Sequence, residues 1–348
     1  MRTLPSQYLD AMLASFNFTS WIHAQRSTPI VKSDPESLAS REVVRLVESG
    51  HPTLALQVQR PEFGFSSSPA LGDVIYVHGA TFGADLSIFH RFDDRSWADA
   101  INDIGLVIWG FDFQGYGASD RYPHDGDRPA GRMDDVIPQL RRVIAAVRAR
   151  NGDRPAFLVA HSWGAAVAAR YAGRYPQDVR ALVMFAPIVT RAPAASTPAA
   201  TALPSHYPVT QWAQYRRFVE DVPRGQPQVL SEAHFQTWAT AFLATDPHAR
   251  ERVPPSVTTP YGPLADIGAM LTGQALYDPS LIAVPTLLVR GEWDSLCTDA
   301  DAGRLLSGLG SREKADVKIE RATHLMHLEL QRRALHDRVN AFLKRTMN

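Results

Sequence analysis

The chain has 348 residues, of which 45% are hydrophobic and one is cysteine, and its 36 basic side chains balance its 36 acidic ones. This length allows one large or two small globular domains with a sizeable core, and it excludes a small scaffold held together by disulfides. Because opposite charges are interspersed along the chain, the sequence lacks the basic footprint of a nucleic-acid-binding protein, and we expect no nucleic-acid partner.

The first segment, residues 1–36, is interpreted as an N-terminal extension. It has no uninterrupted apolar stretch after Met1-Arg2, so we expect no secretory signal peptide and, by default, a cytoplasmic location. Tyr8, Met12 and Phe16 share one face of a partly amphipathic helical pattern. The chain nowhere reaches the ~20 consecutive apolar residues that cross a bilayer, so we expect no membrane span.

From about residue 40 onward, short β-branched runs alternate with longer stretches whose apolar residues recur at helical spacing. This alternation is typical of the α/β class, and it predicts one eight-stranded, mostly parallel sheet with helices on both faces. The expected strands are residues 41–47, 53–59, 73–77, 106–111, 156–160, 181–185, 285–290 and 316–320. The expected helices are residues 96–104, 133–150, 163–175, 299–309 and 328–345.

The alternation stops between the sixth and seventh strands. A stretch rich in proline and alanine, residues 191–208, is followed there by helical patterns around residues 212–219 and 233–243. Since long structureless loops are uncommon in compact domains, we expect a helical cap inserted after the sixth strand. The predicted domains are the N-terminal extension (1–36), an α/β core (37–187 and 284–348) and the helical cap (188–283).

The most informative motif is Ala160-His161-Ser162-Trp163-Gly164, which lies between a predicted strand and a helix rich in small residues. A sharp strand-to-helix turn holds a serine in strained backbone at the carboxyl edge of the sheet, and small neighbours avoid clashes there. The motif therefore predicts a nucleophile elbow with Ser162 as the nucleophile. The alternative is an ordinary serine N-cap, which is common at helix starts; the preceding strand favours the elbow.

A serine nucleophile needs a histidine base and a carboxylate that fixes the tautomer of that histidine. In this fold class the acid and then the histidine follow the serine along the chain, each just after a late strand. Asp294 follows the predicted strand 285–290, and His324 follows the strand 316–320. We therefore predict Ser162, Asp294 and His324 as the catalytic residues, with Glu292 and Asp299 as rival carboxylates.

Two further histidines have other interpretations. His327 is the rival of His324, and the two form a His-x-x-His pair, but no other clustered ligands accompany it, so we expect no metal. His161 precedes the serine on the opposite side of a strand–turn junction, and we expect it to be structural. The sequence indicates no cofactor.

The chemistry also requires backbone N–H donors for the oxyanion of the tetrahedral intermediate. One is expected at the residue after the nucleophile, Trp163, and the other in the loop that follows an earlier strand. The strand 73–77 runs into His78-Gly79-Ala80-Thr81, where the glycine permits a tight turn. We predict Ala80 as the second donor, with Thr81 as a substrate-binding candidate. An ordinary glycine turn is the alternative.

The segment from Asp112 to Ser119 contains two glycines after a strand, but it lacks the third glycine of a dinucleotide fingerprint and the Lys-Ser or Lys-Thr of a P-loop. We interpret it as a structural turn.

Aromatic residues recur at helical spacing in the predicted cap. Such stripes form the core of a cap more often than they line a pocket, yet a capped apolar site is expected as a whole. We take Trp212 and Trp238 as candidates for substrate binding. The two clusters are Trp212, Tyr215 and Phe218, and Phe235, Trp238 and Phe242.

From about residue 40 to its end the chain resembles the α/β-hydrolase superfamily. The resemblance rests on His78-Gly79-Ala80, the segment 112–119, the elbow, and Asp294 with His324; Gln114 and Ala160 replace the more usual arginine and glycine. It implies a serine hydrolase with a cap. Related haloalkane dehalogenases and epoxide hydrolases use an aspartate nucleophile, so Ser162 speaks against both chemistries. Ser-Trp-Gly is also similar to the elbow of prolyl aminopeptidases.

We therefore expect a serine hydrolase that cleaves a carboxylic ester, lactone or thioester of a moderately apolar small molecule through an acyl-enzyme. The same site suits acyl transfer to an alcohol or amine, or release and cyclisation of an acyl natural-product intermediate. A prolyl-aminopeptidase-like peptidase is a further alternative, in which Glu220, Asp221 or Glu232 binds the substrate amine. A non-catalytic ligand receptor is the remaining alternative, because fold alone does not fix function.

Overall fold

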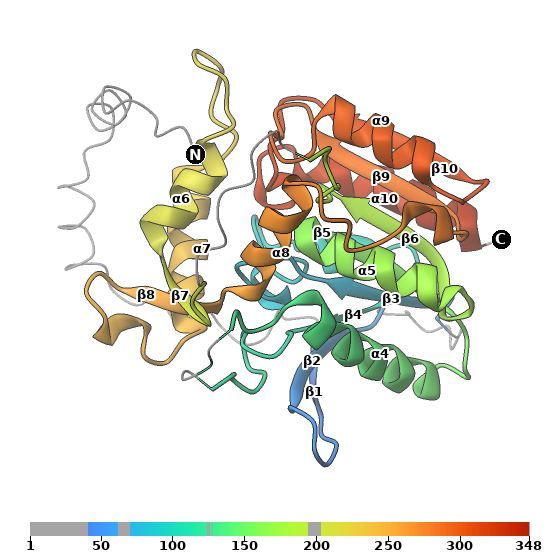
Figure 1. The fold of residues 1–348 in the computed structure, drawn as a ribbon, viewed down its shortest axis with the longest axis horizontal. Helices are drawn as coiled ribbons and strands as arrows, with labels where there is room; N and C mark the ends of the chain where they lie inside the picture. Colours follow the sequence, from blue (N-terminus) through green and yellow to red (C-terminus); the bar gives the residue numbers. More distant parts are fainter. Residues whose placement is uncertain (1–40, 62–69, 124–125, 127, 194–202, 348) are drawn as a thin grey trace. The chain divides into compact units, whose positions relative to one another are not determined.

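The computed structural model describes residues 41–347 except 62–69, 124–125, 127 and 194–202. Eight strands form one sheet in the order β1-β2-β4-β3-β5-β6-β9-β10 (Figure 1). From β4 to β10 all neighbours are parallel, whereas β2 is antiparallel to both β1 and β4. This confirms the predicted class and the eight-stranded, mostly parallel sheet. The strands are β1 (Glu42–Leu46), β2 (Leu54–Gln59), β3 (Gly72–Val77), β4 (Leu106–Phe111), β5 (Ala156–His161), β6 (Val179–Phe185), β9 (Thr286–Gly291) and β10 (Lys314–Ile319).

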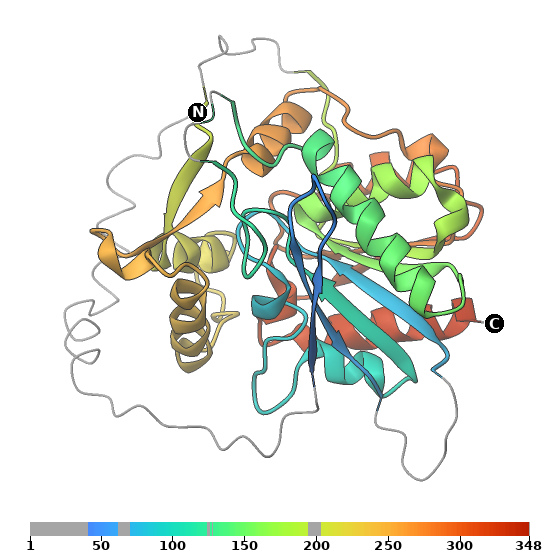
Figure 2. The same ribbon diagram turned by 90° about the horizontal axis from the view of Figure 1, so that it is seen from below.

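Helices cover both faces of this sheet, as Figure 2 shows. The apolar side of α4, α5 and α9 contributes to one core cluster, and that of α3 and α10 contributes to the other. Capping boxes at Ser96 and Thr298 fix the starts of α3 and α9. The helices are α3 (Trp97–Asn102), α4 (Met133–Arg150), α5 (Ser162–Arg174), α9 (Asp299–Gly308) and α10 (Arg332–Met347).

The last helix begins later than the apolar pattern predicts. Residues Met326–Leu328 form a separate 3₁₀ turn, η6, and α10 starts only at Arg332. Between them Glu329 has extended backbone and a fully buried carboxylate that contacts Thr323. This contact with the loop after β10 interrupts the helix that periodicity alone predicts.

Between β6 and β9, the described part of the chain forms two 3₁₀ turns, η4 (Ala249–Glu251) and η5 (Pro279–Leu281), and five further strands and helices. These five are β7 (His206–Thr210), α6 (Gln211–Val219), α7 (Glu232–Ala244), β8 (Ser256–Pro260) and α8 (Gly262–Leu271), and we call residues 188–283 the inserted segment. The expected helices at 212–219 and 233–243 are present, but the segment is not only helical, because β7 and β8 pair antiparallel. Pro208 and Pro260 lie within these strands, and proline is not part of the usual strand pattern, so the sequence does not indicate them. A two-stranded sheet tolerates proline because both of its strands are edges.

An aromatic cluster joins the inserted segment to the sheet's loops. The Trp238 indole N–H donates to the carbonyl oxygen of Leu86 at 2.8 Å, and the ring packs against Phe82 with centroids 5.1 Å apart. Apolar residues from both parts of the chain bury one another here. The cluster includes Phe82, Leu86, Phe92, Phe218, Phe235, Trp238, Phe242, Leu325 and Leu328.

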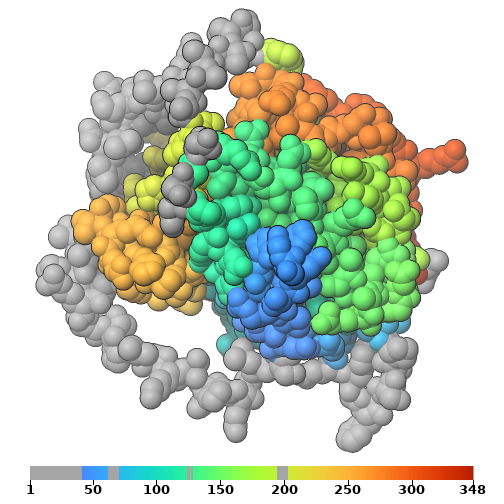
Figure 3. Space-filling view, turned by 60° about the horizontal axis from the view of Figure 1, so that its bottom comes forward, coloured from blue at the N-terminus to red at the C-terminus, as the bar shows by residue number. Residues whose placement is uncertain are grey.

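The β1–β2 hairpin lies against α4 at the edge of the sheet, where Figure 3 shows it in blue beside the green of that helix. Arg142 of α4 donates to the Glu48 carboxylate at 2.7 Å and to the carbonyl oxygens of Pro52 and Leu46. Within the described residues, none of the helices combines the length and apolarity that a membrane crossing requires. The N-terminal extension (1–36), with the pattern of Tyr8, Met12 and Phe16, lies outside the described residues.

Candidate active site

Four parallel strands deliver the predicted site residues to one edge of the sheet. β5 ends at His161, directly before Ser162, and the loops after β9 and β10 carry Asp294 and His324. The structure brings these three together. His324 Nε2 lies 2.7 Å from Ser162 Oγ, and its Nδ1 lies 3.0 Å from both carboxylate oxygens of Asp294. Nδ1 faces a carboxylate and must carry the proton, so Nε2 is the nitrogen that accepts from the serine hydroxyl.

The backbone at the elbow has the strained geometry that the motif predicts. Ser162 has φ of +54°, in the left-handed region that residues with a side chain seldom adopt. Two residues on, a Cβ added to Gly164 would overlap the carbonyl oxygen of His78 and lie 2.8 Å from that of Val77. Glycine is therefore required here, because α5 passes directly against the end of β3.

The surroundings of Asp294 keep it ionised. It is buried, and its Oδ1 accepts hydrogen bonds from the backbone N–H groups of Leu296 and Cys297 at 2.9 and 3.2 Å. Burial alone would raise the pKa of Asp294, but the charge of His324 and the hydrogen bond from it hold the pKa below its ordinary value. The charged form is thus ready to stabilise an imidazolium.

The rival carboxylates are engaged elsewhere. Glu292 accepts from the backbone N–H of Arg321 at 2.8 Å, and Asp299 pairs with Arg290 and Lys318. Neither of them contacts His324 in the described part of the chain.

His161 supports the backbone of His324. Its Nε2 lies 3.1 Å from the carbonyl oxygen of His324, so this nitrogen carries the proton and donates. Burial, with the nearby charge of His324, holds the pKa of His161 well below its ordinary value. The His327 ring lies 4.5 Å from that of His161, and both rings are buried. No group of three or more metal-binding side chains occurs among the described residues.

The turn after β3 passes beside the serine, because a Cβ added to Gly79 would lie 3.4 Å from Cβ of Ser162. Three hydrogen bonds fix this turn. His78 accepts from the backbone N–H of Phe113 at Nε2 and donates from Nδ1 to the carbonyl oxygen of Gly79, and the Tyr116 hydroxyl donates to the carbonyl oxygen of Ala80. The two groups of a trans peptide point in opposite directions, so the Ala80 N–H points away from the His78 ring. In the described part of the chain, the Ala80 N–H donates to no backbone carbonyl.

Trp163 is held by a residue far away in the sequence. Its N–H belongs to the first turn of α5 and has no acceptor within the helix. Its fully buried indole donates to Asp266 of α8 at 3.0 Å. The Asp266 carboxylate also accepts from Arg132 and from the backbone N–H of Met133, at the start of α4.

Tyr116 and Asp266 are supporting residues that no sequence motif predicts. Tyr116 lies in the segment 112–119, which is a turn as expected, and its hydroxyl also reaches the carbonyl oxygen of Ala80. Asp266 is an acidic residue within the otherwise apolar stretch 262–271, and that isolated charge is the signal that marks it.

The three substrate-binding candidates occupy different surroundings. Thr81 follows the Gly79–Ala80 turn and is half-buried. Trp212 is 41% exposed and stacks on Tyr215. Trp238 is fully buried in the aromatic cluster, which favours the alternative that it packs the inserted segment.

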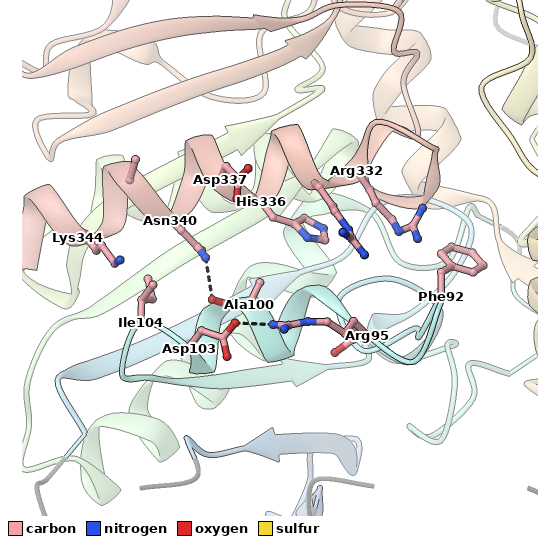
Figure 4. A pocket seen from close by; sticks show the side chains of 13 residues that line it. Phe92, Arg95, Ala100, Asp103, Ile104, Arg332, His336, Asp337, Asn340 and Lys344 are labelled. Atoms are coloured by element: carbon pink, nitrogen blue, oxygen red, sulfur yellow. Dashed lines mark hydrogen bonds and ion pairs between the residues drawn. The ribbon is translucent and has the colours of Figure 1, made fainter. Parts of the chain in front are cut away.

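A cavity of about 650 Å³ lies elsewhere, between α3 and α10 (Figure 4). Figure 4 shows His336 and Asn340 of α10 facing Ala100 and Ile104 across it, with Arg95 and Arg332 at one end. None of Ser162, Asp294 and His324 lines it.

The sequence matches the model of one protein family, described as serine aminopeptidase S33, over residues 72–331. Solved structures that share the fold include the thioesterase domain from the curacin biosynthetic pathway, with a TM-score of 0.60 and 18% identity over 86% of this chain and 99% of that chain. An esterase from Thermogutta terrifontis has a TM-score of 0.52 and 17% identity over 88% and 100% of the two chains. Epoxide hydrolase A from Mycobacterium thermoresistibile has a TM-score of 0.58 and 16% identity over 88% and 98%. No curated protein matches the sequence significantly.

Proposed function

Since this protein belongs to the serine aminopeptidase S33 family and is an α/β-fold hydrolase, we propose that it cleaves a carboxylic ester, lactone or thioester bond of a small, moderately apolar acyl substrate. The observation that carries the proposal is the hydrogen-bond chain from Ser162 Oγ through the His324 ring to Asp294. This arrangement suits nucleophilic catalysis by a serine whose proton is taken by an oriented imidazole.

In the proposed reaction, Ser162 Oγ attacks the acyl carbonyl carbon while its proton moves to His324 Nε2. The imidazolium, stabilised by Asp294, then gives this proton to the leaving alcohol or thiol as the carbon–oxygen or carbon–sulfur bond breaks. Water attacks the acyl-enzyme in the same way, losing a proton to His324, which returns it to Ser162. The acid product leaves and the enzyme is restored.

The negative charge of each tetrahedral intermediate is assigned to two backbone donors, the N–H groups of Ala80 and Trp163. The proximity of the Gly79–Ala80 turn to Ser162 and the position of Trp163 in the first turn of α5 support this assignment. Preorganised donors of this kind typically contribute about 3 kcal/mol each to transition-state stabilisation.

Substrate class is supported by three observations. The structural relatives include proteins described as a thioesterase domain and an esterase. Serine in place of an aspartate nucleophile disfavours the epoxide chemistry named for another relative. The aromatic cluster beside the loops that carry the site favours an apolar acyl group.

Acyl transfer and cyclisation use the same residues, and only the acceptor differs. The aminopeptidase alternative is disfavoured, because its candidate carboxylates already have partners. Arg217 pairs with both Glu220 and Asp221, and Asp221 also accepts from the backbone N–H of Ser295; Glu232 accepts from Gln236.

The test is labelling of the purified protein with a fluorophosphonate, read by intact mass, together with hydrolysis of p-nitrophenyl esters of increasing chain length. We expect one adduct on the wild type and none on Ser162→Ala, whose kcat should fall by about 10⁴-fold or more. Ser307→Ala, which changes an exposed serine on α9, is the matched control and should behave as wild type. A folded wild type that is neither labelled nor active on any ester would refute the proposal and favour the ligand-receptor alternative.

A further inference from the structure

A second buried carboxylate lies next to the segment that carries His324. Glu329 follows η6 and is fully buried. Its carboxylate accepts two hydrogen bonds from Thr323, one from the backbone N–H at 3.1 Å and one from the hydroxyl group. Thr323 is the residue directly before His324, so this carboxylate acts on the backbone that presents the proposed base.

The same contact extends to the other side of His324. The Thr323 hydroxyl, which donates its proton to Glu329, accepts from the backbone N–H of Leu325 at 3.4 Å. With His161 bonded to the carbonyl oxygen of His324, the backbone is fixed before, at and after this residue. Of these contacts, the Glu329 carboxylate alone provides a negative charge.

Among the described residues, no cation pairs with this carboxylate. The Arg332 guanidinium donates to the main-chain oxygen of Glu329 and pairs with Asp93, so it does not neutralise the carboxylate. The charged groups that face Glu329 from neighbouring elements are Asp294, after β9, and Asp221, after α6, and both are negative. An unpaired buried carboxylate is unfavourable for stability, so stability alone does not account for a glutamate in this apolar stretch.

We propose that Glu329 is a positioning residue for His324, whose ionised carboxylate holds the turn 323–325 so that the imidazole stays within reach of both Ser162 and Asp294. The inference rests on the proposed function, because it assigns Glu329 a role only through His324. Protonation changes the turn, since a carboxylic acid donates one hydrogen bond, and among the described contacts of Glu329 the Thr323 hydroxyl is the group that can accept it. The hydroxyl proton must then turn away from Glu329, so this hydrogen bond reverses direction and loses its charged acceptor, which weakens the hold of Glu329 on the turn.

The ionisation of Glu329 occurs near neutral pH. Burial, together with the charges of Asp294 and Asp221, raises its pKa to about 7, against the hydrogen bonds from Thr323 that lower it. The fold therefore favours the protonated acid. The contribution of this group to stability is complete below its ordinary pKa of 4.5 and is lost as the pH rises through 7. The proposed positioning role thus requires the ionised form of Glu329, whereas the stability of the fold favours the protonated form.

The test compares Glu329→Gln with Glu292→Gln. Both variants replace a carboxylate that accepts a backbone N–H in the loop after β10, but Glu292 bonds to Arg321, three residues before His324, and is exposed. For Glu329→Gln at pH 8 we expect kcat to fall by about tenfold or more, because a small misplacement of a catalytic group is costly, with KM within about twofold. Glu292→Gln should keep both parameters.

Two pH series separate positioning from a merely structural role. The kcat of the wild type should fall as the pH drops through about 7, because Glu329 is then protonated. The kcat of Glu329→Gln should fall less over the same pH range. Denaturant unfolding should show the reverse trend: the stability of Glu329→Gln relative to wild type should improve between pH 5 and pH 8. Thr323→Val removes the hydroxyl contacts with Glu329 and Leu325 but keeps the backbone N–H that donates to Glu329. It should lower kcat less than Glu329→Gln, and the double variant should be no worse than Glu329→Gln alone.

An unchanged kcat and pH profile in Glu329→Gln would overturn the proposal, as would equal losses in Glu292→Gln. If Glu329→Gln does not fold, additive losses in Thr323→Val and a milder Glu329→Asp variant would overturn it instead. Failure of the proposed function has a different signature, since the wild type then shows neither fluorophosphonate labelling nor ester hydrolysis. Where the probe labels Ser162 but no ester is cleaved, the labelling rate replaces kcat in every comparison.

Discussion

Two neighbouring positions in the elbow have opposite requirements. Ser162 has a side chain in left-handed backbone, which costs roughly 1–3 kcal/mol, and it persists because the strand before it and the helix after it are both buried. Gly164 has ordinary helical backbone but no space for a side chain, because the carbonyl groups at the end of β3 lie against it. The motif thus combines strain at the nucleophile with close packing two residues later.

We predict that Gly164→Ala destabilises the protein by about 2–4 kcal/mol or prevents folding, because backbone atoms cannot move aside as a flexible side chain would. Gly303→Ala is the matched control: this glycine lies within α9 and a Cβ there meets nothing within 4 Å. Alanine at 303 should stabilise by about 0.5–1 kcal/mol. Urea unfolding of both variants measures the difference, and equal effects would contradict the packing argument.

The three proposed catalytic side chains are predictable from sequence because each lies in the turn or loop that follows a parallel strand, and parallel strands place their carboxyl ends at one edge. Their supporting residues are not. Asp266 contacts Trp163 only because the inserted segment packs against the elbow in the folded protein. Glu329 contacts Thr323 through a turn where periodicity predicts a helix. Such contacts depend on tertiary arrangement, which local pattern does not encode.

Helix α8 is the element that connects the inserted segment to the elbow. Its Asp266 accepts from the Trp163 indole, from Arg132 and from the backbone N–H of Met133, so one carboxylate joins the starts of α4 and α5. Burial raises the pKa of Asp266, against the lowering effect of these donors. Three donors that converge on a buried acceptor leave little freedom for the first turn of α5.

For Asp266→Asn we expect a loss of about 1–3 kcal/mol of stability, since the amide group cannot accept from all three donors, and a fall in kcat at nearly constant KM. Asp135→Asn provides the control, because Asp135 caps the same end of α4 through Arg132 but does not contact Trp163. Its cost should be about 1 kcal/mol, with kcat unchanged. Urea unfolding and ester kinetics are the measurements; a similar fall in kcat for both variants would show that the contact with Trp163 is irrelevant.

The regular elements of the sheet follow from sequence pattern, and α4 and β4 begin and end at the predicted residues. The β7–β8 pair and α8 do not follow from sequence pattern. Proline in both strands removes the usual strand signal, and the sequence Gly262-Pro263 at the start of α8 is typical of a turn.

Across the molecule, the aromatic cluster is where the inserted segment and the loops of the sheet share one core. The predicted division into a core (37–187 and 284–348) and a cap (188–283) stays a prediction. A cap that unfolds independently would need few contacts with the core. The shared cluster and the hydrogen bond between Trp238 and Leu86 instead favour a single unfolding transition for both parts.

We predict that Trp238→Phe lowers the free energy of unfolding by about 1–3 kcal/mol while keeping one cooperative transition, because the change leaves the Leu86 carbonyl unpaired and opens a void. Trp212→Phe changes an exposed ring on α6 and should cost less than about 0.5 kcal/mol. Far-UV circular dichroism and tryptophan fluorescence in urea report the transitions. Two separate transitions in either protein would contradict the shared core, and a raised KM for Trp212→Phe alone would support its role in substrate binding.

The lone cysteine makes the protein suited to site-directed spectroscopy. Cys297 is buried and its backbone N–H donates to Asp294. Burial together with the carboxylates around it raises the pKa of its thiol, so it offers no reactive thiolate that could attack a maleimide dye. Cysteines introduced at exposed positions are therefore the sites that such dyes modify, with no need to remove the native residue. A donor dye on α7 and an acceptor on α4 then report the distance between inserted segment and sheet by energy transfer during turnover.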